Sequence, residues 1–207
     1  MHILSVNKRG LPGAVSDSIK ILERGGIVAY PTESFYALGV NALNAPAVKK
    51  LLDLKKRPAE KAIPVIIGTR DILEKIVKTI PFQARALMDK FWPGALTLIF
   101  HAGEIVPKVL LGGTEKIAVR VPGDSFALTL AQAFPFPITT TSANISGGSP
   151  PRSAQEVVQY FGKEVDLVID QGETPGGEPS TILDITVEPP RVVRNGKISP
   201  DLLSSSR

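Results

Sequence analysis

The sequence predicts one α/β domain over residues 1–207, in which a twisted, mostly buried mixed sheet is flanked by helices. The length of 207 residues is that of a single domain. Hydrophobic residues make up 43% of the chain, which is enough to build a buried core. Helix-like and strand-like patterns alternate between short stretches that contain Gly or Pro, and this alternation favours the α/β class.

The helices are predicted from apolar residues that recur at helical spacing and from residues that cap or end a helix. The first helix has Val15, Ile19 and Leu22 on one face, and two glycines follow it. The last long helix begins at Ser153, with Glu156 three residues later, as in a capping box. In chain order, helices are predicted over residues 15–24, 45–56, 71–80, 82–91, 125–134 and 153–161.

The strands are predicted from short apolar runs that end at a proline, a glycine or a polar stretch. The run over 27–30 ends at Pro31, and the turn Pro93-Gly94 leads into the run that starts at residue 95. Short connections between the last strands favour antiparallel pairs, so we expect a mixed sheet. In chain order, strands are predicted over residues 27–30, 63–67, 95–100, 116–121, 138–141, 165–169, 182–185 and 191–194.

The composition excludes several kinds of site. The chain has no cysteine, which excludes a disulfide scaffold, a cysteine nucleophile and a cysteine-ligated metal. His2 and His101 are the only histidines, so a multi-histidine metal site is excluded as well. The P-loop, Rossmann, H-E-x-x-H and G-x-S-x-G motifs are all missing. No apolar run reaches the roughly 18–20 residues that span a bilayer, and the N-terminus does not resemble a signal peptide, so we expect a cytoplasmic protein outside the membrane.

The positive charge of the chain is concentrated in one segment. Residues 49–61 contain six lysines or arginines and two acidic residues, which equals the net charge of +4 for the whole chain. A local cluster of this kind favours a phosphate-bearing ligand, although a solvated helix face has the same composition.

Four polar stretches lie next to predicted strands or at the end of the basic helix, where α/β folds bind ligands. They cover residues 30–39, 55–58, 139–148 and 176–181. Each of them could also be a simple turn or surface loop. Arg120 is a further candidate, because it interrupts an apolar run and must be paired or face a cavity. A carboxylate ligand, an internal salt bridge or an outward position on an edge strand would each satisfy it.

Taken together and in this order, these stretches resemble the YrdC/TsaC family of threonylcarbamoyl-adenylate synthases. The resemblance runs from about residue 15 to 198 and implies a YrdC/RibB-like fold with its core over that range. Longer members have a C-terminal extension, so the chain resembles the short, single-domain form. The matching motifs are Pro31-Thr32-Glu33 with Tyr36 and Leu38-Gly39, Lys55-x-Arg57-Pro58, Trp92-Pro93-Gly94-Ala95-Leu96-Thr97, Val119-Arg120-Val121-Pro122, Thr141-Ser142-Ala143-Asn144-Ile145-Ser146-Gly147, Pro179-Ser180-Thr181-Ile182 and Val193-Arg194-Asn195-Gly196.

The first motif departs from the usual family pattern P-T-[DE]-T-V-Y-G-L-G. Here Ser34, Phe35 and Ala37 stand where the family has Thr, Val and Gly. Ser34 keeps a hydroxyl group, whereas Ala37 allows the backbone fewer conformations. These departures concern the detail of the substrate pocket, including the choice of amino acid.

The resemblance implies a nucleotidyltransferase that makes threonylcarbamoyl-AMP and pyrophosphate from L-threonine, bicarbonate or carbon dioxide, and ATP. The product would serve the modification of a tRNA adenosine beside the anticodon, through a downstream threonylcarbamoyl-transferase complex. Magnesium would accompany ATP and be held mainly by the substrate phosphates, without protein ligands. Weak binding of tRNA by this chain is compatible with that role.

The resemblance also implies a role for ten residues. The catalytic group would be Lys55, Arg57, Ser142 and Asn144, which would also bind ATP together with Lys61 and Arg194. The threonine-binding group would be Thr32, Arg120, Thr140 and Ser180, with Arg120 on the carboxylate.

Two other functions stay open from the sequence. One is a carbamoyl-adenylate-forming module, as in hydrogenase maturation proteins, although those modules belong to longer chains with cysteine-rich zinc elements. The other is a non-catalytic RNA-binding protein, which the basic cluster permits. Aromatic residues make up only 6% of the chain, and no stacking platform interleaves with the cations, which disfavours RNA binding alone.

Overall fold

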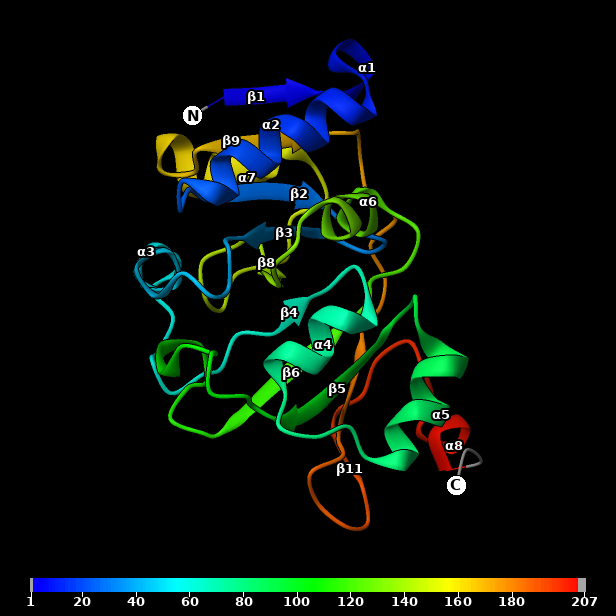
Figure 1. Cartoon of the computed structure of the whole chain (residues 1–207). Coiled ribbons are helices and arrows are strands. Elements are labelled where there is room, and N and C mark those ends of the chain that lie inside the picture. Colours follow the sequence, from blue (N-terminus) through cyan, green and yellow to red (C-terminus); the bar gives the residue numbers. More distant parts are fainter. Residues whose placement is uncertain (1, 205–207) are drawn as a thin grey trace.

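The computed structural model describes residues 2–204 (Figure 1). The strands are β1 (His2–Ser5), β2 (Val28–Pro31), β3 (Tyr36–Gly39), β4 (Val65–Ile66), β5 (Leu96–His101), β6 (Lys116–Arg120), β7 (Ile138–Thr139), β8 (Thr141–Ser142), β9 (Leu167–Asp170), β10 (Thr181–Asp184) and β11 (Arg191–Arg194). The helices are α1 (Val6–Arg9), α2 (Leu11–Glu23), α3 (Ala45–Lys55), α4 (Arg70–Ile76), α5 (Phe82–Phe91), α6 (Phe126–Ala133), α7 (Ala154–Phe161) and α8 (Pro200–Ser204). Two short 3-10 turns are η1 (Lys108–Leu110) and η2 (Gly162–Glu164). Within residues 2–204, no helix combines the length and the apolar character needed to cross a membrane.

The strands form two mixed sheets, which occupy the upper and lower halves of Figure 1. The first sheet has the order β1-β9-β2-β3-β8, with β1, β9 and β2 parallel and β3 and β8 antiparallel to their neighbours. The second has the order β11-β10-β5-β6-β4-β7, with β10 parallel to β5 and β4 parallel to β6. The predicted mixed α/β class is confirmed, and the strands are divided between two sheets.

One segment, residues 138–142, connects the two sheets. Its first part, β7, pairs with β4 of the second sheet, and its last part, β8, pairs with β3 of the first. Between them, the Thr140 amide donates to the carbonyl of Pro64 at 2.8 Å. The Tyr30 hydroxyl of the first sheet donates to the Thr139 carbonyl at 2.9 Å, which ties the sheets together a second time. The strand predicted over 138–141 is therefore interrupted at Thr140, where the chain passes from one sheet to the other.

Two apolar clusters cover the two faces of the first sheet. Val28 and Tyr30 pack with α2 and α6 on one face. Their neighbours Ile27 and Ala29 belong to the larger cluster on the other face, which also includes residues of α3, α7 and the second sheet. This alternation is what a strand buried on both faces requires, and it explains the uninterrupted apolar run that predicted β2.

Some predicted boundaries are wrong for local reasons. The helix expected over 71–80 ends at Ile76, because Val77 is extended and forms a bridge with Ala102. The strand β3 lies inside the polar stretch 30–39, for which no strand is predicted after residue 30, and all four of its residues are buried. The strand β1 and the short helices α1 and α8 lie outside the predicted elements, and β8 overlaps the strand predicted over 138–141 only at Thr141. The cap at Ser153 is confirmed, since its hydroxyl accepts from the Glu156 amide at 3.2 Å.

We predict that Gly39→Ala destabilises the protein by about 2–3 kcal/mol. A Cβ at this position would lie 2.6 Å from Tyr30 Cε1, 2.7 Å from Ile138 Cγ2 and 3.0 Å from the Thr139 carbonyl oxygen. These atoms belong to the junction between the sheets, which cannot move without breaking its hydrogen bonds. The measurement is the free energy of unfolding in a denaturant titration. The control is Gly123→Ala, whose Cβ would meet Glu33 at an ordinary 3.5 Å and should change stability by less than about 0.5 kcal/mol. Equal effects of the two substitutions would contradict the prediction.

Candidate functional site

A cavity of about 650 Å³ lies between the two sheets. One wall comes from the turn before β3 and from the segment around Thr140 and Ser142. The opposite wall is a face of the second sheet, where alternate residues of β5, β6 and β10 point into the cavity. The cavity is thus formed at the junction of the sheets.

Seven of the ten predicted site residues line this cavity. They are Thr32, Arg57, Arg120, Thr140, Ser142, Ser180 and Arg194. The polar stretches that carry them are far apart in the sequence, and the fold brings them together. Lys55, Lys61 and Asn144 are not in the lining.

Lys55 lies behind the cavity wall and is 2% exposed. Its Nζ donates to the carbonyl oxygens of Ser142 and Asn144, the latter at 2.5 Å. Its own carbonyl accepts from the Ser146 amide at 3.1 Å, so Lys55 fixes the loop that follows β8 from both sides. Burial, followed by the nearby charge of Arg57, lowers the pKa of Lys55 from 10.5 to about 8.

Asn144 closes the same loop. Its Nδ2 donates to the carbonyl oxygens of Ile145 and Gly148, both at 2.8 Å. Its Oδ1 is buried and has no hydrogen-bond partner among residues 2–204. The loop therefore contains a buried side-chain acceptor that no described residue satisfies.

The way in which the basic helix α3 ends determines the position of Arg57. Lys56 adopts a left-handed conformation with a φ of 50°, which ends α3 and turns the chain. Arg57 Nε then donates to the Lys61 carbonyl at 3.1 Å, and Nη2 donates to the Ala62 carbonyl at 2.8 Å. Burial lowers the pKa of Arg57. Lys61 contributes its backbone to this arrangement, whereas its side chain is exposed.

Arg120 reaches the cavity from β6 and is 7% exposed. Its Nη1 donates to Glu33 Oε1, so the internal salt bridge considered from the sequence is present. Thr32 is next to Glu33, but its hydroxyl donates to the Phe35 carbonyl at 2.7 Å and accepts from the amides of Ser34 and Phe35. It stabilises the turn between β2 and β3 that presents Glu33.

Ser180 and Arg194 form a second polar group on the opposite wall. Arg194 Nη2 donates to Ser180 Oγ at 2.9 Å and to the Ser180 carbonyl at 2.8 Å. Ser180 Oγ is also 2.8 Å from Thr97 Oγ1, which lines the cavity as well. Partial burial and the nearby charge of Arg120 lower the pKa of Arg194.

The electrostatics of the cavity favour an anionic ligand. Arg57, Arg120 and Arg194 all line it, and Glu33 pairs with one of them. Backbone groups and small hydroxyls of the 140–142 segment complete a surface suited to phosphate and carboxylate oxygens. Within the part of the chain that the structure describes, no three His, Cys, Asp or Glu side chains are grouped as metal ligands.

Neither Glu33 nor Thr97 is among the site residues predicted from the sequence. A signal for Glu33 was available, because a buried arginine needs a partner and Glu33 follows the buried strand that ends at Pro31. Thr97 has no comparable signal, since a threonine in a strand is ordinary.

Fold and site together define an α/β protein with a cavity between its two sheets whose lining is suited to an anionic ligand. The model of the Sua5/YciO/YrdC family, described as telomere recombination, matches residues 20–196, and the chain belongs to this family. The resemblance found in the sequence is thereby confirmed.

The relatives include named enzymes. A threonylcarbamoyl-AMP synthase of Pyrococcus abyssi is 40% identical over 94% of this chain and 57% of its own length. One of Idiomarina loihiensis is 38% identical over 77% of this chain and 87% of its own length. A crystal structure of Pyrococcus abyssi Sua5 complexed with L-threonine has a TM-score of 0.94 and 37% identity, over 100% of this chain and 61% of that one. The chain thus spans less than two thirds of the length of the Pyrococcus proteins it matches.

We predict that Lys55 makes stability rise with pH above about 8. In the folded protein its pKa is about 8, against an ordinary 10.5, so above pH 8 unfolding takes up a proton. The free energy of unfolding should therefore increase by about 2 kcal/mol between about pH 8 and 10 relative to the variant Lys55→Met. Denaturant titrations across this range measure the difference.

The control for this prediction is Lys56→Met, which removes the neighbouring exposed lysine. It should keep the pH dependence of the unchanged protein. If Lys55→Met and the unchanged protein have parallel pH profiles, Lys55 does not carry a lowered pKa.

Proposed function

We propose that the protein is a threonylcarbamoyl-AMP synthase. The observation that carries this proposal is a cavity with arginines at separate positions on its walls, in a chain 40% identical to a named synthase. The reaction joins two anionic substrates, a carboxylate-bearing amino acid and a nucleoside triphosphate. A cavity with several anion-binding groups is suited to hold both at once.

The chemistry needs positioning more than a covalent intermediate. The amine of L-threonine forms a C–N bond with bicarbonate, and water leaves to give a carbamate. A carbamate oxygen then attacks the α-phosphorus of ATP, and the bond to pyrophosphate breaks. The product is threonylcarbamoyl-AMP, which makes the protein a nucleotidyltransferase. Neither step requires a protein nucleophile, and charge stabilisation is the main contribution to phosphoryl transfer.

We assign the triphosphate to the end of the cavity near Arg57 and Ser142. Arg57 supplies fixed guanidinium donors there. Lys55 and Asn144 act from behind, by holding the loop after Ser142 in shape and by adding the positive charge of Lys55. Lys61 and its exposed ammonium group could reach the phosphates only from the cavity mouth.

We assign the amino acid to the wall formed by Arg120 and Ser180. Arg120 binds the carboxylate, and Thr140 lies at the junction with the nucleotide end. Thr32 acts through the turn it stabilises. Arg194 lies beside Ser180 and contacts the nucleotide from the opposite wall.

Magnesium would enter with ATP on the substrate phosphates, as the family resemblance implies. The metal would neutralise charge on the phosphates during transfer.

The wider context of the protein is also part of the proposal. The product would pass to a threonylcarbamoyl-transferase complex that modifies a tRNA adenosine, and weak tRNA binding by the basic segment 49–61 would be compatible with this route. A single domain over residues 1–207 and a cytoplasmic location stay predictions from the sequence.

The experiment that tests this function is the release of pyrophosphate from ATP and bicarbonate, with and without L-threonine. Release that depends on threonine supports the synthase. Release only with carbamoyl phosphate would indicate the carbamoyl-adenylate-forming module instead. No release under either condition, with salt-sensitive binding of RNA, would indicate the non-catalytic alternative.

We predict that variants at the two ends of the cavity affect different substrates. Arg57→Ala should raise KM for ATP by about tenfold to a hundredfold, and Arg120→Ala should do the same for L-threonine, because each removes a charged hydrogen-bond donor. Each variant should change the other KM by less than about threefold. Steady-state pyrophosphate release measures both constants.

The control is Lys56→Ala, which removes an exposed cation next to Arg57 and should change neither constant. An increase in the same KM for Arg57→Ala and Arg120→Ala would refute the assignment of the two ends.

A further inference from the structure

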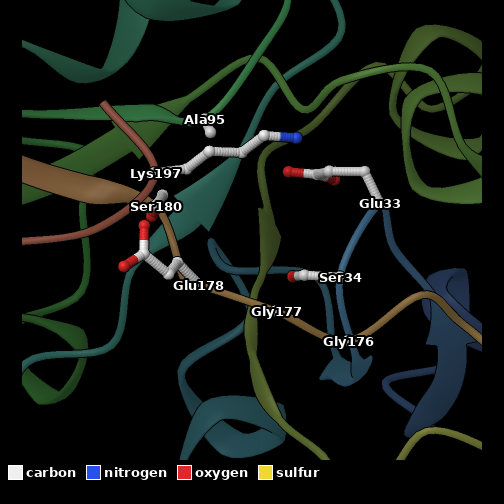
Figure 2. Close-up of a pocket in the computed structure, with 8 residues that line it drawn as sticks. All are labelled: Glu33, Ser34, Ala95, Gly176, Gly177, Glu178, Ser180 and Lys197. Atoms are coloured by element: carbon white, nitrogen blue, oxygen red, sulfur yellow. The ribbon is translucent and has the colours of Figure 1, made fainter. Parts of the chain in front are cut away.

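Glu33 lines a second, smaller cavity beside the first. This cavity has a volume of about 260 Å³ and shares Ser34, Gly177 and Ser180 with the larger one. Figure 2 shows Glu33 on one side of it, with Lys197 extending toward it from the other. The sequence analysis gave no role to either of these two charged side chains.

The two oxygens of the Glu33 carboxylate have different surroundings. Oε1 accepts from Nη1 of Arg120, which lines the large cavity. Oε2 is buried and has no hydrogen-bond partner among residues 2–204. An unpartnered carboxylate oxygen is unfavourable in a protein interior, so this atom calls for a donor from a ligand. Glu33 lines the small cavity, and because the last torsion of a glutamate is broad, its carboxylate can reorient toward a donor that is bound there.

Lys197 does not satisfy this oxygen. It faces the same cavity, but the described part of the chain contains no ion pair between Lys197 and Glu33, whose one partner there is Arg120. Glu178, the other acidic residue of this cavity, is exposed and available to water. Of the two acidic residues that line this cavity, Glu33 is therefore the one with a buried oxygen that lacks a hydrogen-bond donor.

We propose that Glu33 and Arg120 together bind the amino-acid substrate as a zwitterion, with Arg120 on the carboxylate and Glu33 on the α-ammonium group. In an α-amino acid these two charges are attached to neighbouring carbon atoms, so the groups that bind them must also be neighbours. Glu33 and Arg120 are in direct contact. As a pair they are neutral, which matches the zero net charge of the ligand. This inference rests on the proposed function and adds to it the residue that selects an amine.

The test compares two ligands that differ only at that group. L-threonine has an α-ammonium group, and (2S,3R)-2,3-dihydroxybutanoate has a hydroxyl in its place. The unchanged protein should bind L-threonine at least about tenfold more tightly, because a charged hydrogen bond is lost with the second ligand. Titration calorimetry with each ligand gives this selectivity ratio.

The decisive variant is Glu33→Gln. It keeps the shape of the side chain and an oxygen that can accept from Arg120, but it removes the negative charge. We expect its selectivity ratio to fall to within about threefold of one, with threonine affected and the hydroxy acid nearly unchanged. A purely structural role of Glu33 would weaken both ligands equally and leave the ratio as it was.

Two matched variants complete the experiment. Glu178→Gln removes the exposed carboxylate of the same cavity and should keep the ratio of the unchanged protein. Lys197→Gln should also keep it. If Lys197→Gln abolishes the selectivity as Glu33→Gln does, Glu33 pairs with Lys197 and the proposal is overturned. Should Glu33→Gln fail to fold, Glu33→Asp takes its place. Aspartate keeps the negative charge but is one methylene shorter, so its carboxylate lies farther from the ligand. An unchanged selectivity ratio for this variant would overturn the proposal.

The outcomes also separate this inference from the proposed function. Threonine-dependent pyrophosphate release together with equal binding of both ligands by the unchanged protein would overturn the role of Glu33 and leave the synthase intact. Absence of both threonine binding and threonine-dependent release would overturn the two together. A high ratio that collapses only in the Glu33 variant supports the zwitterion site.

Discussion

The passage of one chain segment from one sheet to the other is the constraint on which the site depends. Residues 138–142 pair with β4 at one end and with β3 at the other, so the two sheets cannot separate or slide without breaking this segment. The Tyr30 hydroxyl on the Thr139 carbonyl adds a buried tie at the same place. The cavity opens beside this junction, and each of its walls belongs to a different sheet. Because this junction is rigid, the two walls keep a fixed position relative to each other.

A buried positive charge determines the shape of the wall nearest the basic helix. An ammonium group at this depth requires several acceptors, and Lys55 finds them in the backbone carbonyls of the loop after β8. The same contacts fix that loop, so the desolvation that lowers the pKa of Lys55 is linked to the order of the Ser142 segment. In the Lys55-x-Arg57 motif, therefore, Arg57 lines the cavity, whereas Lys55 lies behind the wall and supports the loop after β8.

Much of this arrangement could be predicted from the sequence, and the exceptions have physical reasons. Helices such as α3 and α7 were predicted because periodicity and capping are local properties. The division into two sheets was not predictable, because it depends on pairings between strands far apart in the chain, and β8 has only two residues, both polar. The seven residues in the lining were found through the order of their motifs. The position of Lys55 behind the wall could not be read from those motifs, since a lysine at the end of a helix is usually exposed.

The two proposed ends of the cavity differ in their electrostatics, and the difference fits the ligands that we assign to them. The proposed nucleotide end combines Arg57 in the lining with the charge of Lys55 behind the wall, and the lining of the large cavity contains no acidic residue, as a polyanion requires. At the proposed amino-acid end, Arg120 pairs with Glu33, which lines the smaller cavity next to the large one. Excess positive charge there would attract any carboxylate and would leave an ammonium group unfavourable. Pairing Arg120 with a carboxylate on one side moderates that attraction, leaves its other N–H donors for a second carboxylate and adds a place for an amine. A cavity of this kind can hold a strongly anionic substrate and a neutral zwitterion side by side without either site attracting the wrong one.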